Sequence, residues 1–470
     1  MRLNRSTILT NPSNNSTRST EIYARKHKSD RLLATQKAIE AAEEARHEWA
    51  GKTAQERSAV LRRWYELMMT HTDELAEILT LEQGKPLSEA KGEIQYAASF
   101  LEWFAEEGKR IYGDVIPTHK SDARLMVIKQ PVGVVAAITP WNFPAAMITR
   151  KCAPALAAGC SFIVKPALET PFSALALAAL AEKAGVPAGV FNVITGKSSA
   201  IGKVLTDSNL VRKLSFTGST HIGKLLMQQS AGTVKKVSME LGGNAPFIVF
   251  PDTDLDAAVE GAMASKFRNA GQTCVCTNRF LAHDEVYDLF VEKLTAAVNQ
   301  LQVGNGLDSG VDQGPLINAA AVSKVAEHVA DALSKGAKIT TGGGPHSEGQ
   351  NFYKPTVVCD VTSDMQVADD ETFGPLAPVF RFGTEDEAIM MANDTESGLA
   401  AYVYTRDIGR VWRVSEKLEY GMVGINEGII STAVAPFGGI KESGTGREGS
   451  KYGIDDYVEI KYLMMGGLGS

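Results

Sequence analysis

The chain of 470 residues has little cysteine: only Cys152, Cys160, Cys274, Cys276 and Cys359. Five scattered cysteines do not make the disulfide framework of a small secreted protein. No Cys-x-x-Cys pair and no His-Glu-x-x-His motif occurs, so the sequence predicts no metal site. Most of the thiols are expected to be small core residues, and at most one or two to be reactive.

Long apolar runs and an excess of one charge are also missing. No segment approaches the ~18 uninterrupted apolar residues of a membrane helix. With 48 basic and 55 acidic residues the net charge is −7, which argues against nucleic-acid or membrane partners. Hydrophobic residues make up 44%, which excludes a disordered chain. The pattern favours an enzyme with two or three packed subdomains.

The N-terminus is polar. Twelve of the first twenty residues are Ser, Thr or Asn, three are Arg and none is acidic. This composition faintly resembles an organelle transit peptide, but no apolar face of helical period supports import. We therefore expect a polar N-terminal arm and a cytoplasmic location, with a mitochondrial location as the alternative.

Hydrophobic periodicity predicts an α/β fold. Apolar residues recur at three- and four-residue spacing over residues 32–110, which predicts helices covering one side of a sheet. Beyond Asp114, short apolar runs alternate with helical stretches, and a second such region begins near Glu240. The alternation indicates two doubly wound parallel sheets that bind ligands at the carboxyl ends of their strands. Residues 457–465 are predicted to form an edge strand that pairs with another sheet, in this chain or a second subunit.

Three segments carry residues suited to chemistry. Gly218 and Gly223 bracket a strand-to-helix turn that would let backbone N–H groups approach a phosphate, although such glycines are often structural. Cys274 follows a Gly-Gln-Thr loop and is either a partly exposed, reactive thiol or an ordinary strand cysteine. Glu240, at a strand end, is either a general base with a raised pKa or a solvated carboxylate.

Asn142 lies in an otherwise apolar turn, Trp-Asn-Phe-Pro at 141–144. A buried asparagine must be hydrogen-bonded, and an oxyanion is one possible partner.

Together these segments resemble the aldehyde dehydrogenase superfamily over residues 11–468. Two further motifs complete the set: Glu-Thr-Phe-Gly-Pro at 371–375 and Pro-Phe-Gly-Gly at 436–439. Three short motifs resemble those of its succinate-semialdehyde dehydrogenase branch: Ile-Thr-Arg-Lys at 148–151, Phe-Arg-Asn at 267–269 and the segment 446–453.

The resemblance implies a domain plan. Residues 1–111 and 131–240 would form a Rossmann-like cofactor-binding domain, and 241–445 the catalytic domain. Residues 112–130 and 446–470 would form a small β arm that makes a homo-oligomer, a dimer or a tetramer.

The resemblance also implies a reaction: oxidation of succinate semialdehyde to succinate, a step of 4-aminobutyrate degradation. Cys274 would attack the aldehyde, Asn142 and the Cys274 N–H would hold the oxyanion, and Glu240 would activate the water that hydrolyses the thioester. A different semialdehyde, such as glutarate semialdehyde, is the alternative, since one methylene changes specificity little. A non-enzymatic relative would be expected to lack Cys274 and Glu240.

A nicotinamide cofactor is implied as well, bound by residues that match the family: Trp141, Lys165, Gly218, Ser219, Gly223, Glu371 and Phe373. Leu168 stands where an acid would accept from the ribose 2′-hydroxyl and repel a 2′-phosphate. The sequence therefore slightly favours NADP over NAD, unless the adjacent Glu169 turns inward.

The family match assigns Arg150, Arg268 and Ser431 to the substrate carboxylate, which suits the planar fork of arginine. In an extended segment Cys276 would face the same way as Cys274. Cys276 is therefore a candidate redox switch through a disulfide with Cys274, or else an inert core cysteine.

Overall fold

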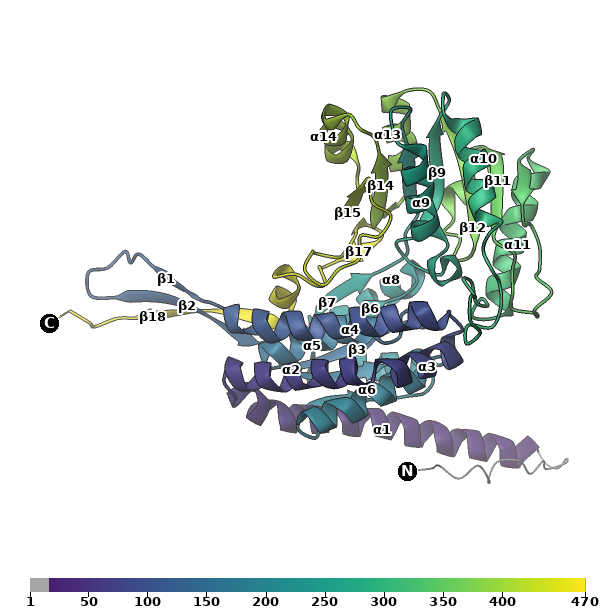
Figure 1. Ribbon diagram of the computed structural model, residues 1–470. Coiled ribbons are helices and arrows are strands. Elements are labelled where there is room, and N and C mark those ends of the chain that lie inside the picture. The colour runs from purple at the N-terminus through teal and green to yellow at the C-terminus, as the bar shows by residue number, and fades with distance from the viewer. Residues whose placement is uncertain (1–16, 470) are drawn as a thin grey trace.

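The computed structural model describes residues 17–469 (Figure 1). The N-terminal arm predicted from the first twenty residues falls almost entirely outside this range. No helix in the described part of the chain is long and apolar enough to cross a membrane.

A six-stranded sheet of order β17-β7-β6-β3-β4-β5 forms the first layered unit. Its strands are β3 (Val134–Ile138), β4 (Ser161–Lys165), β5 (Phe191–Val193), β6 (Val211–Thr217), β7 (Lys236–Glu240) and the short antiparallel β17 (Gly444–Thr445). The connecting helices are α5 (Ala146–Ala158), α6 (Pro171–Ala184), α7 (Ser198–Asp207) and α8 (Thr220–Ser230). The chain runs outward from β3 to β5 and returns to place β6 beside β3. The carboxyl ends of β3 and β6 therefore form the switch point at which such sheets bind ligands.

The N-terminal helices are α1 (Thr17–Gly51), α2 (Ala54–Thr70), α3 (Thr72–Gln83) and α4 (Leu87–Glu107). Helices α2 and α4 pack with α5 around the fully buried Trp64 and Phe100. Ile39 of α1 instead packs with Leu205 of α7 in the core on the opposite face. The prediction that all these helices cover one side of the sheet is therefore wrong for the part of α1 around Ile39, whereas Trp49 near the end of α1 lies in the same core as Trp64. Periodicity gives a helix an apolar face but not a partner.

The second layered unit is a seven-stranded sheet of order β10-β11-β12-β9-β8-β14-β15. Its strands are β8 (Ala245–Val249), β9 (Thr277–His283), β10 (Lys338–Thr341), β11 (Thr356–Val361), β12 (Leu376–Phe382), β14 (Ala400–Tyr404) and β15 (Met422–Ile425). All neighbours are parallel except β10 and β11. Its helices are α9 (Leu255–Lys266), α10 (Tyr287–Val298), α11 (Ala319–Ser334), α12 (Gln366–Asp369), α13 (Glu385–Asn393) and α14 (Ile408–Lys417). Two short strands, β13 (Ser397–Gly398) and β16 (Ile440–Lys441), pair separately.

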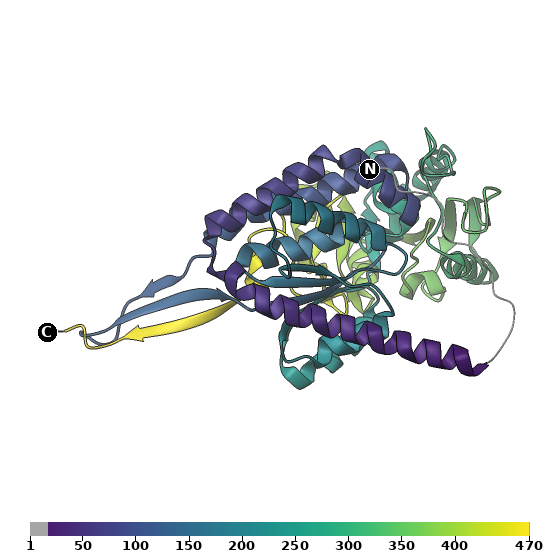
Figure 2. The ribbon, with the colours of Figure 1, turned by 90° about the horizontal axis from the view of Figure 1, so that it is seen from below.

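A small antiparallel sheet projects from the body (Figures 1 and 2). It consists of β1 (Asp114–Ile116), β2 (Arg124–Pro131) and β18 (Val458–Met465). The predicted edge strand pairs with β2 of its own chain, from Val458 opposite Pro131 to Met465 opposite Arg124. Within residues 17–469 the outer edge of β18 is unpaired. The predicted fold class, two doubly wound sheets with a small β arm, is confirmed.

Candidate active site

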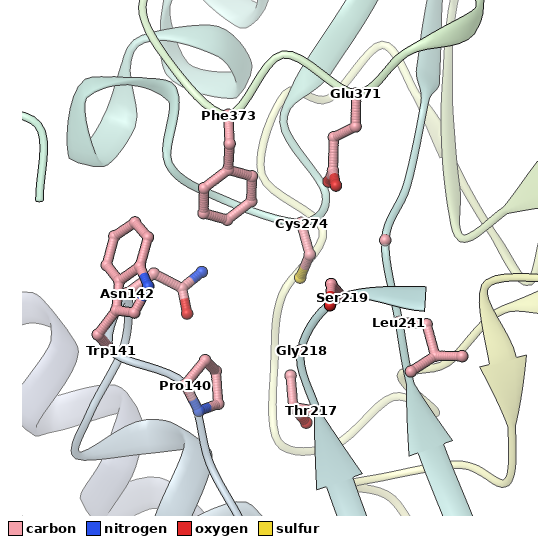
Figure 3. Close-up of a pocket in the computed structure, with 11 residues that line it drawn as sticks. Pro140, Trp141, Asn142, Thr217, Gly218, Ser219, Leu241, Cys274, Glu371 and Phe373 are labelled. Atoms are coloured by element: carbon pink, nitrogen blue, oxygen red, sulfur yellow. The ribbon is translucent and has the colours of Figure 1, made fainter. Parts of the chain in front are cut away.

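A cavity of about 260 Å³ lies where the switch point of the first sheet faces the second sheet (Figure 3). Five loops line it: after β3, after β6, after β7, before β9 and before β12. The lining residues are Pro140, Trp141, Asn142, Thr217, Gly218, Ser219, Leu241, Gly242, Cys274, Glu371 and Phe373. The Cys274 side chain points into it, with the Asn142 amide beside it. Residues as far apart in the sequence as Pro140 and Phe373 thus meet around one thiol.

A second cavity, of about 450 Å³, shares five residues with the first: Pro140, Trp141, Thr217, Gly218 and Ser219. Lys165, Leu168 and Glu169 line it too, and Lys165 Nζ donates to Ser198 Oγ at 2.6 Å. The two cavities together form a continuous path over the carboxyl ends of β3 and β6.

Gly223 lines neither of these two cavities in the described part of the chain. A Cβ at this position would lie 2.4 Å from Leu241 Cδ2. The glycine allows α8 to pack closely on the end of β7, so the structural reading of Gly223 explains it. Its predicted contact with a cofactor remains a prediction.

A strained turn presents Cys274. Asn269, Ala270 and Gly271 have successive positive φ values of 54°, 55° and 73°, which costs energy for the two non-glycine residues. The Asn269 N–H donates to the Glu89 carboxylate at 2.9 Å, and Nδ2 donates to the Asn142 carbonyl at 3.0 Å. A Cβ on Gly271 would lie 2.2 Å from the Gly374 carbonyl oxygen. Hydrogen bonds and close packing therefore fix the loop that carries the thiol.

The segment from Cys274 to Cys276 is not extended, because the Cys276 N–H donates to the Thr273 carbonyl at 3.0 Å and closes a turn. The premise of an extended segment is therefore wrong. Cys276 is fully buried, and its Sγ lies 3.1 Å from the Gly271 carbonyl oxygen and 3.9 Å from Lys266 Nζ. A disulfide would require this turn to rearrange, and the redox switch remains a prediction.

Asn142 is held by a buried polar network. Its side-chain Nδ2 donates to the Gln272 carbonyl at 3.0 Å, and its backbone carbonyl accepts from Lys85 Nζ at 2.8 Å. Lys85 forms a fully buried ion pair with Glu93, 2.6 Å apart, and Glu93 accepts from the Ala145 N–H at the start of α5. The sequence reasoning missed Lys85 and Glu93. A charged Glu93 among the apolar positions of α4 was the available signal, because buried carboxylates need partners.

Glu240 ends β7 and is buried, and neither carboxylate oxygen makes a hydrogen bond within residues 17–469. It does not line the 260 Å³ cavity. A Cβ on Gly438 would lie 2.9 Å from Glu240 Oε1, so the carboxylate faces that loop. Burial and then the charge of Glu448 raise the pKa of Glu240 well above its usual range, while Arg150 and Lys151 oppose the shift.

The partners of Glu448 are Arg150 and Lys151, both buried on α5. Lys151 Nζ also donates to Thr217 Oγ1, at 2.6 Å, and Thr217 lines the cavity. These ion pairs were not predicted, although Lys151 and Glu448 stand in two of the segments quoted for the family. Nothing in the local sequence relates residues that are 297 positions apart.

Burial raises the pKa of the Cys274 thiol to about 12, Glu371 and Glu240 add to the effect, and Arg150 opposes it. The thiol is therefore protonated in this arrangement, and a base must accept its proton before it can attack. Burial likewise raises the pKa of Glu371 to about 7, and its Oε1 accepts from the Gly243 N–H at 3.2 Å.

The three residues assigned to a substrate carboxylate lie outside the cavity lining. Arg150 packs its guanidinium 3.9 Å over the Phe437 ring, and Arg268 lies 5.3 Å from the centre of the Phe143 ring. Among the described residues Arg268 has no ion pair within 4.0 Å. Ser431 is half-buried in the loop that follows β15.

Comparison with known proteins gives consistent matches. The model of the Aldehyde dehydrogenase family matches residues 8–463. The succinate-semialdehyde dehydrogenase [NADP(+)] GabD of Escherichia coli is 67% identical over 92% of this chain and 90% of that protein. A glutarate-semialdehyde dehydrogenase of Pseudomonas aeruginosa is 65% identical, with the same coverage of both chains. The crystal structure of succinate-semialdehyde dehydrogenase from Burkholderia pseudomallei is 66% identical, with a TM-score of 0.92 over 93% of this chain and 90% of that one.

Proposed function

The chain belongs to the aldehyde dehydrogenase family, and from this premise we propose that it oxidises succinate semialdehyde to succinate with a nicotinamide cofactor, NADP or NAD. The observation that carries the proposal is the Cys274 thiol pointing into a cavity that continues over the switch point of the sheet. The identity of 67% to the Escherichia coli enzyme supports the substrate.

The residues present fit a dinucleotide. The two cavities share the loops that follow β3 and β6, where a parallel sheet holds phosphates. Trp141, Gly218, Ser219, Glu371 and Phe373 would hold the cofactor on the side of Cys274. When bound, the nicotinamide accepts the hydride that leaves the aldehyde carbon.

The residues that line the 450 Å³ cavity favour NADP. Lys165 offers a cation there, beside Ser198 at the first position of α7. The Leu168 side chain is 58% exposed and can neither accept from a 2′-hydroxyl nor repel a 2′-phosphate. Glu169 also lines this cavity and is exposed. Its carboxylate can accept a hydrogen bond from a ribose 2′-hydroxyl, so we propose NAD as the second cofactor.

The chain's own residues perform the remaining steps. Cys274 Sγ passes its proton to water and attacks the aldehyde carbon. Asn142 Nδ2 donates one hydrogen to the resulting oxyanion, while its other hydrogen is donated to the Gln272 carbonyl. After hydride loss the thioester on Cys274 is attacked by water. Glu240 removes a proton from that water, a task suited to a carboxylate whose pKa is raised by burial and by the charge of Glu448.

The experiment that tests this function measures kcat/KM for succinate semialdehyde, glutarate semialdehyde and butanal, each with NADP⁺ and with NAD⁺. We expect kcat/KM for succinate semialdehyde to exceed that for butanal by about two orders of magnitude, because unpaired buried donors penalise the neutral aldehyde. Glutarate semialdehyde is the second candidate, favoured by the 65% identity to the Pseudomonas aeruginosa enzyme. Equal kcat/KM values for butanal and succinate semialdehyde would contradict the proposal.

Arg268 offers a test of carboxylate recognition that breaks no ion pair among the described residues. Arg150 does not, since its loss would leave Glu448 underpaired in the core. We expect Arg268→Gln to raise KM for succinate semialdehyde about tenfold and to leave KM for butanal within about twofold. Steady-state rates with both aldehydes measure this, and a parallel rise in both KM values would give Arg268 a structural role only.

We also propose a cytoplasmic homo-oligomer in which the arm contacts a second copy. The arm exposes Val115, Ile460 and Tyr462, at 80%, 72% and 55%, and the outer edge of β18 is open within residues 17–469. Such an edge favours pairing with another chain.

A further inference from the structure

Two buried hydrogen-bond donors near Cys274 have no hydrogen-bond partner in the described part of the chain: the Tyr96 hydroxyl and Arg150 Nη2. Buried donors in native proteins nearly always have a partner, and each exception requires an explanation. A protein can leave such donors unpaired when a ligand completes them. The mechanism above does not use Tyr96.

The two donors belong to one packed row between α4 and α5. Tyr96 and Phe100 lie one turn apart on α4, with ring centres 5.0 Å apart and planes at 66°. The Arg150 guanidinium from α5 lies 5.9 Å from the Phe100 ring and 3.9 Å from the Phe437 ring. Phe100 therefore packs against both the Tyr96 ring and the Arg150 guanidinium.

Tyr96 lies within electrostatic range of the reactive thiol. The charges of Arg150 and Arg268 both act on the Tyr96 phenol, and so does Cys274. Burial is the largest effect and raises the pKa of Tyr96. The hydroxyl therefore keeps its proton and acts as a donor, not as a base.

The chemistry of the row fits an aliphatic carboxylate. A phenol and a guanidinium both donate to carboxylate oxygens, and the charged acceptor makes each hydrogen bond stronger than a neutral one. Aromatic rings suit the methylenes that join the carboxylate to the aldehyde. A neutral aldehyde would leave both donors unpaired.

We propose that the Tyr96 hydroxyl donates a hydrogen bond to the substrate carboxylate beside Arg150, and so selects acidic aldehydes over neutral ones. This inference rests on the proposed function, and it assigns Tyr96 a role in specificity that is distinct from the chemistry at Cys274.

The test is Tyr96→Phe, which removes one oxygen and keeps the ring that packs on Phe100. Tyr65→Phe is the matched control: it removes a phenol from α2, where the ring contacts Arg62. We expect Tyr96→Phe to raise KM for succinate semialdehyde about tenfold, with kcat and the KM for butanal within about twofold of wild type. Tyr65→Phe should leave all of these values unchanged.

A second readout avoids turnover. Succinate should protect Cys274 from alkylation by iodoacetamide, and half-protection should need about tenfold more succinate in Tyr96→Phe than in wild type. Unchanged protection and unchanged KM in Tyr96→Phe, with wild type still preferring succinate semialdehyde to butanal, would overturn the role of Tyr96 alone. A wild type without that preference would overturn the proposed function together with this inference.

Discussion

Replacing Cys274 with alanine is expected to lower kcat for succinate semialdehyde by at least about 10⁴-fold, because loss of a covalent nucleophile removes the whole two-step route. The first turnover should disappear as well, since hydride leaves only from the adduct on Cys274. The measurement is the pre-steady-state burst of reduced cofactor, followed by absorbance in a stopped-flow instrument.

Cys359→Ala is the matched control, because Cys359 is a half-buried thiol on β11 and lies outside both cavities. It should retain both the burst and the steady-state rate. A burst of wild-type amplitude in Cys274→Ala would show that another group attacks the aldehyde.

Replacing Glu240 with glutamine should separate the two halves of the reaction. Glutamine keeps the shape of the side chain but cannot accept a proton from water, so steady-state turnover should fall about 10²–10⁴-fold. The burst should persist, with an amplitude near one reduced cofactor per subunit, because attack and hydride loss precede hydrolysis. Equal loss of burst and turnover would show that Glu240 is also needed to activate Cys274.

The pH profile of the wild type gives an independent check on Glu240. The carboxyl must lose its proton to act as a base, and burial together with Glu448 raises its pKa. The rising limb of kcat should therefore lie at higher pH than an ordinary glutamate would give. In Glu240→Gln the limb that belongs to this group should be absent from the residual rate.

Much of the fold could be predicted because its signals are local. Alternation of apolar runs and helical stretches predicts the parallel strands and the helices of the first sheet but not the short antiparallel β17, since side-chain periodicity follows from backbone geometry. Periodicity alone did not predict the pairing of β18 with β2, which the family resemblance implied by placing both segments in one arm. Nor did it predict the packing of Ile39 of α1 on the opposite face. Both depend on which distant apolar surface is available, and periodicity does not carry that information.

The turn at Cys274 shows the same limit at the site. The sequence predicts an exposed reactive thiol in a loop, but an extended strand was the wrong backbone for Cys274 and Cys276. The left-handed conformations of Asn269 and Ala270 are held by Glu89 and by the Asn142 carbonyl. Those partners come from other segments, so no local rule gives the turn.

By itself the sequence determined the kinds of chemistry available: one thiol in a loop, one carboxylate at a strand end, one amide in an apolar turn, and the family that arranges them. Only the tertiary structure decided the state of these groups. Glu448 beside Glu240, Glu93 beside Lys85 and the unpaired Tyr96 hydroxyl are products of burial and of contacts between distant segments. The energy of a buried charge or donor depends on its nearest partners in space, and those partners are fixed only when the chain has folded.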